Sequence, residues 1–317
     1  MSDFRIAVIG IGATGAVLAA ALLSRDPQTM LVARRPGLID KIRQSGITIS
    51  GELNYHVPAR NLFEKISDIK DRDPNLIFVA TKTFDLPEVI EALKAVFTPG
   101  IKIVSTHNGL GTEDVITEAF GADAALRMSL NFGAFLKGQF EAATTFFNRP
   151  NHLGGLVPEN KKVGLKIAAL FTASGLDTEY VDDIKFYVWK KMIMKCTMAS
   201  ICAVTDKTIR DALGFSPTRE IADACFREAL AVARAKGYDL GDDYLTHAMA
   251  YLEKVGIHKD SMCVDIANRT RTEIDFLGAK VVEYGKETGI PTPYYETMTN
   301  LVKAIEDNYL RQLQSPT

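Results

Sequence analysis

Short apolar runs alternate with longer amphipathic segments through the first half of the chain. Continuous aliphatic runs of four or five residues are typical of buried strands, whereas apolar residues that recur every three or four positions indicate helices. Strands are predicted over residues 5–9, 30–33, 76–80 and 103–106, and helices over residues 13–24, 38–45, 86–96 and 112–119. This alternation predicts a doubly wound parallel sheet of the α/β class.

Other segments of the first half interrupt this alternation. Residues 47–56, with a Ser-Gly turn, are expected to form a hairpin, and residues 125–147 are rich in strand-forming side chains. We expect residues 151–155 to form a glycine-containing turn that leads into a strand and helix over residues 156–174.

From about Asp183 onward the helical period dominates. Helices are predicted over residues 188–204, 216–236, 243–255, 263–288 and 294–312. The sequence therefore predicts a Rossmann-type domain over residues 1–182, followed by an all-helical domain over residues 183–317. A cleft between the two would be a natural place for a cofactor and a substrate to meet.

A glycine-rich loop joins the first predicted strand to the first predicted helix. It reads Gly10-Ile11-Gly12-Ala13-Thr14-Gly15. In this pattern Gly10 permits a tight turn, Gly12 lets the backbone approach a pyrophosphate, and Gly15 lets helix and strand pack closely. Free N–H groups at the helix N-terminus favour an anion there. A dinucleotide site is the favoured interpretation, and a purely structural turn is the alternative.

Two arginines indicate which dinucleotide is bound. The second predicted strand ends in Arg34 and Arg35, at the position where an acidic residue would bind the ribose of NAD. A guanidinium group forms strong bidentate bonds with a phosphate. We therefore expect NADP, with Arg34 as the main contact to the 2′-phosphate and Arg35 in support. The alternative is that the pair is simply solvated at the end of the strand.

Composition and charge limit the remaining classes of function. The 317 residues carry a formal net charge of −2 and show no cluster of basic residues, so nucleic acid is not an expected partner. No apolar run reaches the length of a membrane span, and no signal peptide is evident. We expect a cytoplasmic protein that acts on a small molecule, and we expect a homodimer.

Cysteine and histidine spacing gives no sign of a metal site. Four cysteines lie in apolar helical contexts, and the five histidines are scattered along the chain. We expect reduced core thiols and no bound metal ion.

Six motifs together resemble the ketopantoate reductase family, and the resemblance covers nearly the whole chain. They are Gly10-Ile11-Gly12-Ala13-Thr14-Gly15, His107-Asn108-Gly109-Leu110-Gly111, Trp189-Lys190-Lys191, Ser261-Met262 with Asp265, Thr272-Glu273-Ile274-Asp275, and Gly289-Ile290-Pro291-Thr292-Pro293. The resemblance implies a Rossmann domain followed by a helical domain. It also implies NADPH-dependent reduction of 2-dehydropantoate to (R)-pantoate.

The resemblance also implies catalytic roles for Lys191 and Glu273. Hydride delivery to a ketone produces an alkoxide that needs a proton donor and nearby positive charge, and Lys191 matches the family's catalytic lysine. A solvated lysine on a helix face is the alternative. By resemblance, Glu273 holds the cofactor ribose or orients Lys191, whereas a salt bridge to Arg269 or Arg271 would be an ordinary structural role.

Three further residues match family positions that bind substrate or cofactor. Asn108 matches a residue that contacts both, although asparagine is also a common turn former. Ser261 matches a serine that binds the substrate carboxylate, with a helix N-cap as the alternative. Lys82 matches a lysine near the cofactor phosphates, and it could equally cap the sheet edge.

The chain departs from the family pattern on the substrate side. Asparagines usual in the family are replaced by Lys195, Ala199, His258 and Tyr295. Lys195 follows Lys191 by one helical turn, so repulsion between the two would lower the pKa of one lysine if their face is partly buried. Alternatively, Lys195 binds a substrate carboxylate directly. We also expect His258 to lie on the substrate side.

The leading hypothesis is therefore an NADPH-dependent reductase of 2-dehydropantoate. A reductase of a different 2-oxo acid, with a rebuilt substrate pocket, is the second. The third belongs to another class, a non-catalytic NADP(H)-binding regulatory protein.

Overall fold

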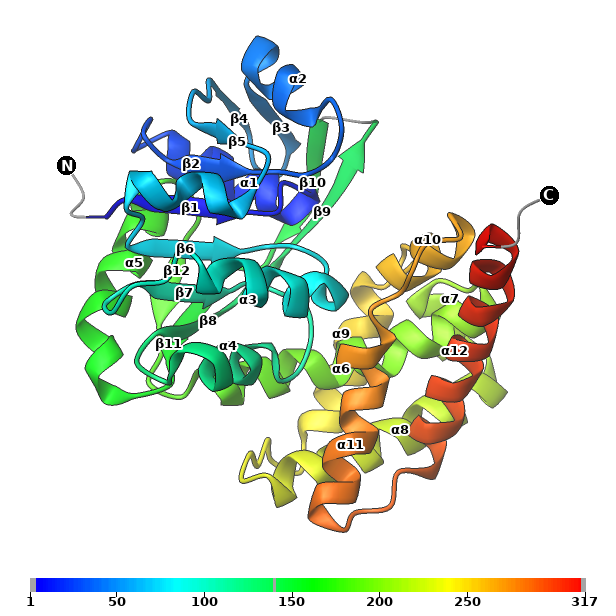
Figure 1. The fold of residues 1–317 in the computed structure, drawn as a ribbon. Coiled ribbons are helices and arrows are strands. Elements are labelled where there is room, and N and C mark those ends of the chain that lie inside the picture. Colours follow the sequence, from blue (N-terminus) through cyan, green and yellow to red (C-terminus); the bar gives the residue numbers. More distant parts are fainter. Residues whose placement is uncertain (1–3, 139–140, 315–317) are drawn as a thin grey trace. The chain divides into compact units, whose positions relative to one another are not determined.

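Buried aliphatic strands form the centre of the first of two units into which the chain divides (Figure 1). The computed structural model describes residues 4–138 and 141–314. The first unit runs to Asn108 and resumes over Thr112–Ile184, and the second takes Gly109–Gly111 and the chain from Lys185 onward.

The main sheet of the first unit has eight strands. They are β1 (Ile6–Ile9), β2 (Met30–Val32), β5 (Leu62–Phe63), β6 (Leu76–Val79), β7 (Lys102–Ser105), β8 (Ala125–Ser129), β11 (Asn151–Gly155) and β12 (Thr178–Tyr180). Their spatial order is β12-β11-β8-β7-β6-β1-β2-β5, and every neighbouring pair is parallel except β8 and β11. The predicted doubly wound parallel sheet is confirmed.

Helices cover both faces of this sheet. On one face lie α1 (Ala13–Leu23) and α5 (Lys161–Ala173), and on the other lie α3 (Leu86–Lys94) and α4 (Thr112–Phe120). The short helix α2 (Leu38–Ser45) follows β2. Three 3₁₀ segments, Ile66–Arg72, Thr83–Asp85 and Pro158–Asn160, complete the connections.

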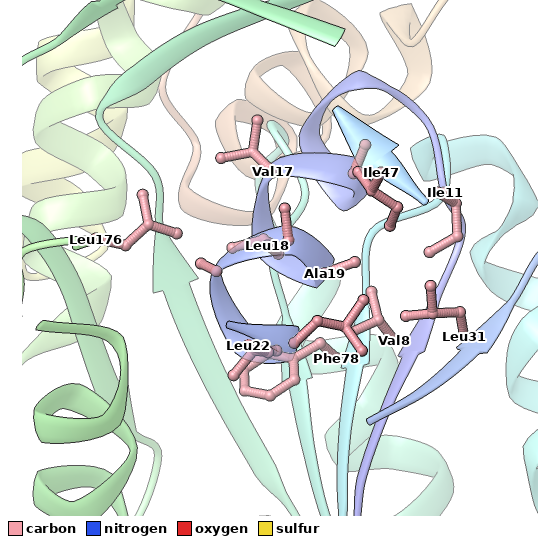
Figure 2. Packing of buried hydrophobic residues seen from close by; sticks show 14 of the residues in the cluster. Val8, Ile11, Val17, Leu18, Ala19, Leu22, Leu31, Ile47, Phe78 and Leu176 are labelled. Atoms are coloured by element: carbon pink, nitrogen blue, oxygen red, sulfur yellow. The ribbon is translucent and has the colours of Figure 1, made fainter. Parts of the chain in front are cut away.

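Helix α1 is buried on all sides from Gly15 to Leu23. Figure 2 shows its side chains Leu18 and Leu22 beside Phe78 of β6, which makes an edge-to-face contact with Phe171 of α5 at 5.2 Å. An apolar helix without a polar face must be buried on every side. A second sheet packs against α1 and completes its burial.

That second sheet has four strands in the order β4-β3-β10-β9. They are β3 (Ile47–Gly51), β4 (Tyr55–Val57), β9 (Phe132–Lys137) and β10 (Glu141–Phe147). The predicted hairpin is confirmed as the antiparallel pair β3 and β4, with Ile49 opposite Tyr55. Strand β10 joins β3 in parallel, and β9 pairs with β10 in antiparallel fashion.

The prediction of a turn at residues 151–155 is wrong, because this segment is strand β11. Its glycines serve close packing instead of a turn. A Cβ on Gly154 would lie 2.6 Å from the Val181 carbonyl oxygen, and a Cβ on Gly155 would lie 2.2 Å from Cβ of Asn160. The strand predicted just after it is replaced by an extended step into the 3₁₀ turn Pro158–Asn160.

The second unit is helical, as predicted. Its helices are α6 (Ile184–Thr205), α7 (Ile209–Gly214), α8 (Ser216–Ala235), α9 (Tyr244–Val255), α10 (Ser261–Ala267), α11 (Gly278–Thr288) and α12 (Pro293–Gln314). Within the described part of the chain, none of the helices has the length and apolar character to span a lipid bilayer.

The helix predicted without interruption over residues 263–288 is divided in two. Helix α10 ends at Ala267, Arg269 takes a left-handed backbone with φ of 53°, and α11 begins at Gly278. A 3₁₀ turn, Ile274–Phe276, lies in the intervening loop. The loop that results carries Glu273.

Candidate active site

The glycine loop between β1 and α1 is fixed by close backbone packing. Gly10 has a φ of +91°, and a Cβ there would lie 2.7 Å from the backbone nitrogen of Thr81. A Cβ on Gly15 would lie 1.8 Å from the carbonyl oxygen of Gly10. Both positions therefore require glycine in order to fold, independently of any ligand.

Gly12 differs, because no atom lies within 4 Å of the Cβ that a substitution would add. It is the N-cap of α1, no side chain caps this helix end, and its first turn has no acidic residue. Ile11 is buried in the core, whereas Ala13 and Thr14 are half-buried at the helix end. An open cradle beside an uncapped helix N-terminus fits the pyrophosphate of a dinucleotide.

The guanidinium of Arg34, just beyond the end of β2, meets two carboxylates. Its Nη2 lies 2.5 Å from Oδ1 of Asp85, and its Nη1 lies 2.7 Å from Oε2 of Glu88. The hydrogen bonds to Glu88 and then to Asp85 raise the pKa of Arg34. Arg35 is exposed beside it, and the carbonyl of Lys82 accepts from the N–H of Asp85. Sequence reasoning missed both acids, which follow Arg34 by more than fifty residues.

A buried polar network holds the end of β7. Arg127 of β8, 1% exposed, donates from Nη1 to Ser105 at 2.7 Å and from Nη2 to the His107 carbonyl at 2.6 Å. Its Nε lies 3.7 Å from a carboxylate oxygen of Glu113, which is also buried. The His107 ring lies between the hydroxyls of Ser105, at 3.0 Å, and Thr81, at 3.3 Å.

This network connects the end of β7 with the glycine loop, because Thr81 also packs against Gly10. Burial, and secondarily the charge of Arg127, lowers the pKa of His107 to about 3. The ring is therefore neutral near neutral pH. Asn108 follows directly and is half-buried, so its backbone position is set by a chain of buried hydrogen bonds.

In the second unit, the loop that carries Glu273 is tied to α12. The N–H and hydroxyl of Thr272 both donate to Glu306, and the hydroxyl of Tyr309 donates to the Thr270 carbonyl at 2.7 Å. The segment Gly109–Gly111 joins the same loop, since the N–H of Leu110 donates to the Phe276 carbonyl at 2.9 Å. Glu273 is half-buried.

Neighbours of Glu273 in this loop form ion pairs. Asp275 pairs with Arg271 at 3.4 Å and with Lys303 at 2.8 Å.

Aromatic packing fixes the first turns of α6. Trp189 is 4% exposed and stacks on Tyr238 with a centroid distance of 6.0 Å, and it also contacts Tyr284. The hydroxyl of Tyr244 donates to the Lys190 carbonyl. Lys191 is half-buried on the helix held in this way.

One turn further along α6, Lys195 lies in a cluster with Asp260 and Ser261. Its Nζ lies 2.8 and 2.5 Å from the two carboxylate oxygens of Asp260 and 2.9 Å from the Ser261 hydroxyl. Two of the predicted substrate residues are thus brought together. Sequence reasoning missed Asp260. Its carboxylate offsets the positive charge of Lys195, which we expected to repel the ammonium of Lys191. The only signal for it was that aspartate is a preferred N-cap residue.

The remaining departures from the family pattern have different surroundings. Tyr295 is fully buried, and its hydroxyl lies 2.6 Å from that of Thr197 on α6, so it packs in the core of the second unit. Ala199 is also fully buried. His258 is exposed in the loop that precedes α10.

Comparison with known proteins shows the family of the chain. The sequence model described as "Ketopantoate reductase PanE/ApbA" matches residues 6–156, and the model of the same family's C-terminal part matches residues 183–306. The chain belongs to the ketopantoate reductase family.

Relatives of this ketopantoate reductase family member align over almost their full length. A 2-dehydropantoate 2-reductase from Streptococcus pyogenes is 27% identical, with 94% of this chain and 97% of the relative covered. A crystal structure of 2-dehydropantoate 2-reductase from Geobacter metallireducens has a TM-score of 0.88 at 23% identity, covering 95% and 99% of the two chains. D-mandelate dehydrogenase with NADH and anilino(oxo)acetate has a TM-score of 0.85 at 23% identity, covering 96% and 99%.

Substitutions in the glycine loop should separate folding from cofactor binding. Gly12→Ala fills open space, so we expect it to leave the thermal unfolding midpoint nearly unchanged while weakening the binding of a reduced nicotinamide dinucleotide, measured by fluorescence titration. Gly15→Ala forces a backbone clash and should lower the free energy of unfolding by about 3 kcal/mol or more. Equal losses of stability in the two variants would contradict this reading of the loop.

The buried His107 should make the stability of the first unit depend on pH. The pKa of His107 is about 3 in the folded chain against an ordinary value of 6.5, so only the unfolded chain takes up a proton between these values. Its contribution is complete above pH 6.5 and is lost as the pH falls toward 3. Between pH 7 and 5, the unfolding free energy should fall by about 2 kcal/mol more in the wild type than in His107→Gln. Parallel pH curves from urea unfolding would show that His107 is not buried in neutral form.

Proposed function

We propose that this protein reduces 2-dehydropantoate to (R)-pantoate with NADPH. The observation that carries the proposal is the hydrogen bond between Ser261 of α10 and Lys195, which lies one helical turn beyond Lys191 on α6, in a chain that both family models match. Lys191 is half-buried, Lys195 follows it by one turn on α6, and Ser261 at the start of α10 accepts a hydrogen bond from Lys195. A lysine with such groups near it suits the reduction of a 2-oxo acid.

The first unit would hold the cofactor. The cradle at Gly12 and the N-terminus of α1 would receive the pyrophosphate, and Arg34, Arg35 and Lys82 would neutralise phosphate charge. Bound NADPH supplies the hydride. Arg34 already forms ion pairs with Asp85 and Glu88. A bound 2′-phosphate would therefore compete with these two carboxylates for the Arg34 guanidinium.

Lys191 would protonate the oxygen of the carbonyl group that is being reduced. As negative charge develops on that oxygen, the lysine ammonium stabilises it and then donates a proton. The packing of Trp189 and the bond from Tyr244 to the Lys190 carbonyl fix the helix that presents Lys191. In this mechanism Glu273 orients Lys191 or holds the cofactor ribose.

The substrate carboxylate would bind to Ser261, supported by Lys195. We propose that Asn108 contacts both substrate and cofactor, and that His258 lines the substrate side. The hydrogen bond from Lys195 to the Ser261 hydroxyl oxygen leaves that hydroxyl's own hydrogen as a donor for the carboxylate.

A second candidate function is the reduction of a different 2-oxo acid. The replacement of family asparagines by Lys195, Ala199 and His258 favours it, because the resemblance assigns these positions to the substrate side, while the glycine loop is intact. Steady-state rates on a panel of 2-oxo acids would distinguish the two candidates.

Removal of the Lys191 ammonium should abolish most of the activity. We expect Lys191→Met to lower kcat for 2-dehydropantoate reduction by about 100-fold or more, the usual contribution of a general acid. The matched control is Lys190→Met, which removes an exposed neighbouring ammonium and should leave kcat unchanged. NADPH oxidation at 340 nm measures both. Equal rates for wild type and Lys191→Met would exclude the proposed proton donor.

Arg34 should set the preference for NADPH. Arg34→Met is expected to raise the KM for NADPH by about tenfold or more, because a charge-assisted phosphate contact is lost, and to leave the KM for NADH nearly unchanged. Arg43→Met, which removes another exposed and ion-paired arginine of the same unit, is the control. An equal rise for both cofactors would mean that Arg34 does not recognise the 2′-phosphate.

A further inference from the structure

The charge of Lys195 is matched by a partner that the family resemblance did not predict. A lysine ammonium has three N–H donors, and three acceptor atoms lie within 2.9 Å of it. Two of them are the carboxylate oxygens of Asp260, and the third is the hydroxyl oxygen of Ser261. The local group of Lys195 and Asp260 therefore has no net charge.

Asp260 is held in place from a second direction. It is the N-cap of α10, where its Oδ1 accepts the N–H of Met262 at 2.9 Å, and its side chain is 7% exposed. Moving Lys195 away to bind another anion would leave a buried carboxylate without its cation, which is strongly unfavourable. Lys195 thus remains with Asp260 when a substrate binds.

We infer that Asp260 neutralises the charge of Lys195, so that the substrate site binds a 2-oxo acid with a single carboxylate and an uncharged side chain. The inference rests on the proposed function, because it takes Ser261 as the carboxylate-binding residue. Asp260 acts through Lys195 and is a positioning residue. A free Lys195 at this position would instead favour a second carboxylate on the substrate.

The test compares two substrates in the full-length protein and in Asp260→Asn. This variant keeps an N-cap acceptor for Met262 and frees the charge of Lys195. The probes are 2-dehydropantoate, with one carboxylate, and 2-oxoglutarate, with two. We expect the wild type to prefer 2-dehydropantoate, and we expect Asp260→Asn to shift the ratio of kcat/KM values toward 2-oxoglutarate by roughly tenfold.

Two controls separate this charge effect from a loss of structure. Asp206→Asn breaks an exposed pair, that of Asp206 with Lys259 at 2.6 Å, in the same unit and should leave the substrate ratio unchanged. Combining Asp260→Asn with Lys195→Asn should return the ratio toward the wild-type value, because the freed charge is gone. Asp260→Ser, a second substitution with an N-cap acceptor, serves if Asp260→Asn does not fold.

The outcomes distinguish the inference from the proposed function. If the wild type reduces 2-dehydropantoate but neither Asp260 variant changes the ratio, the inference is overturned and the proposed function stands. A wild type that prefers 2-oxoglutarate also overturns it. If the wild type oxidises NADPH neither with 2-dehydropantoate nor with 2-oxoglutarate, the proposed function fails and the inference fails with it.

Discussion

The contact between the first turn of α1 and the backbone of Gly10 is the constraint on which the first unit depends. Because Gly15 has no side chain, α1 packs directly over the end of β1 and continues into the core, buried from Gly15 to Leu23. Both sheets of the unit cover this helix. The helix N-terminus remains uncapped beside open space at Gly12, so the packing that stabilises the unit also leaves a helix end that suits the proposed binding of an anion.

Local patterns were sufficient to predict strands β1, β2, β6 and β7, helices α1 to α4 and the glycine loop. What they missed depends on partners that are distant in the sequence. Asn151–Gly155 has the composition of a turn, yet its glycines allow close packing in β11 against Val181 and Asn160. The apolar periodicity over residues 263–288 predicts one continuous helix, although the chain leaves the helical conformation at Arg269. Glu306 of α12 stabilises the resulting loop by accepting the N–H of Thr272.

The site residues show the same division. The glycine loop and the lysines of α6 could be named from motifs. The carboxylates that pair with the predicted cations could not be predicted from motifs, because they come close only through the tertiary fold. Asp85 and Glu88 pair with Arg34, and Asp260 pairs with Lys195. In each case a cation that the sequence offers to a ligand is balanced by a carboxylate of the protein. The proposed substrate and cofactor preferences therefore involve these ion pairs as well as the cations themselves.

The proposed function requires this chain to reduce a substrate with a bound nicotinamide cofactor and not only to bind the cofactor. A single-turnover experiment tests this most directly: protein saturated with one equivalent of NADPH is mixed with excess 2-dehydropantoate in a stopped-flow instrument, and the product is identified by chiral chromatography. We expect rapid oxidation of the bound NADPH with formation of an equal amount of (R)-pantoate. Bound NADPH that remains reduced with this substrate and with other 2-oxo acids would contradict it.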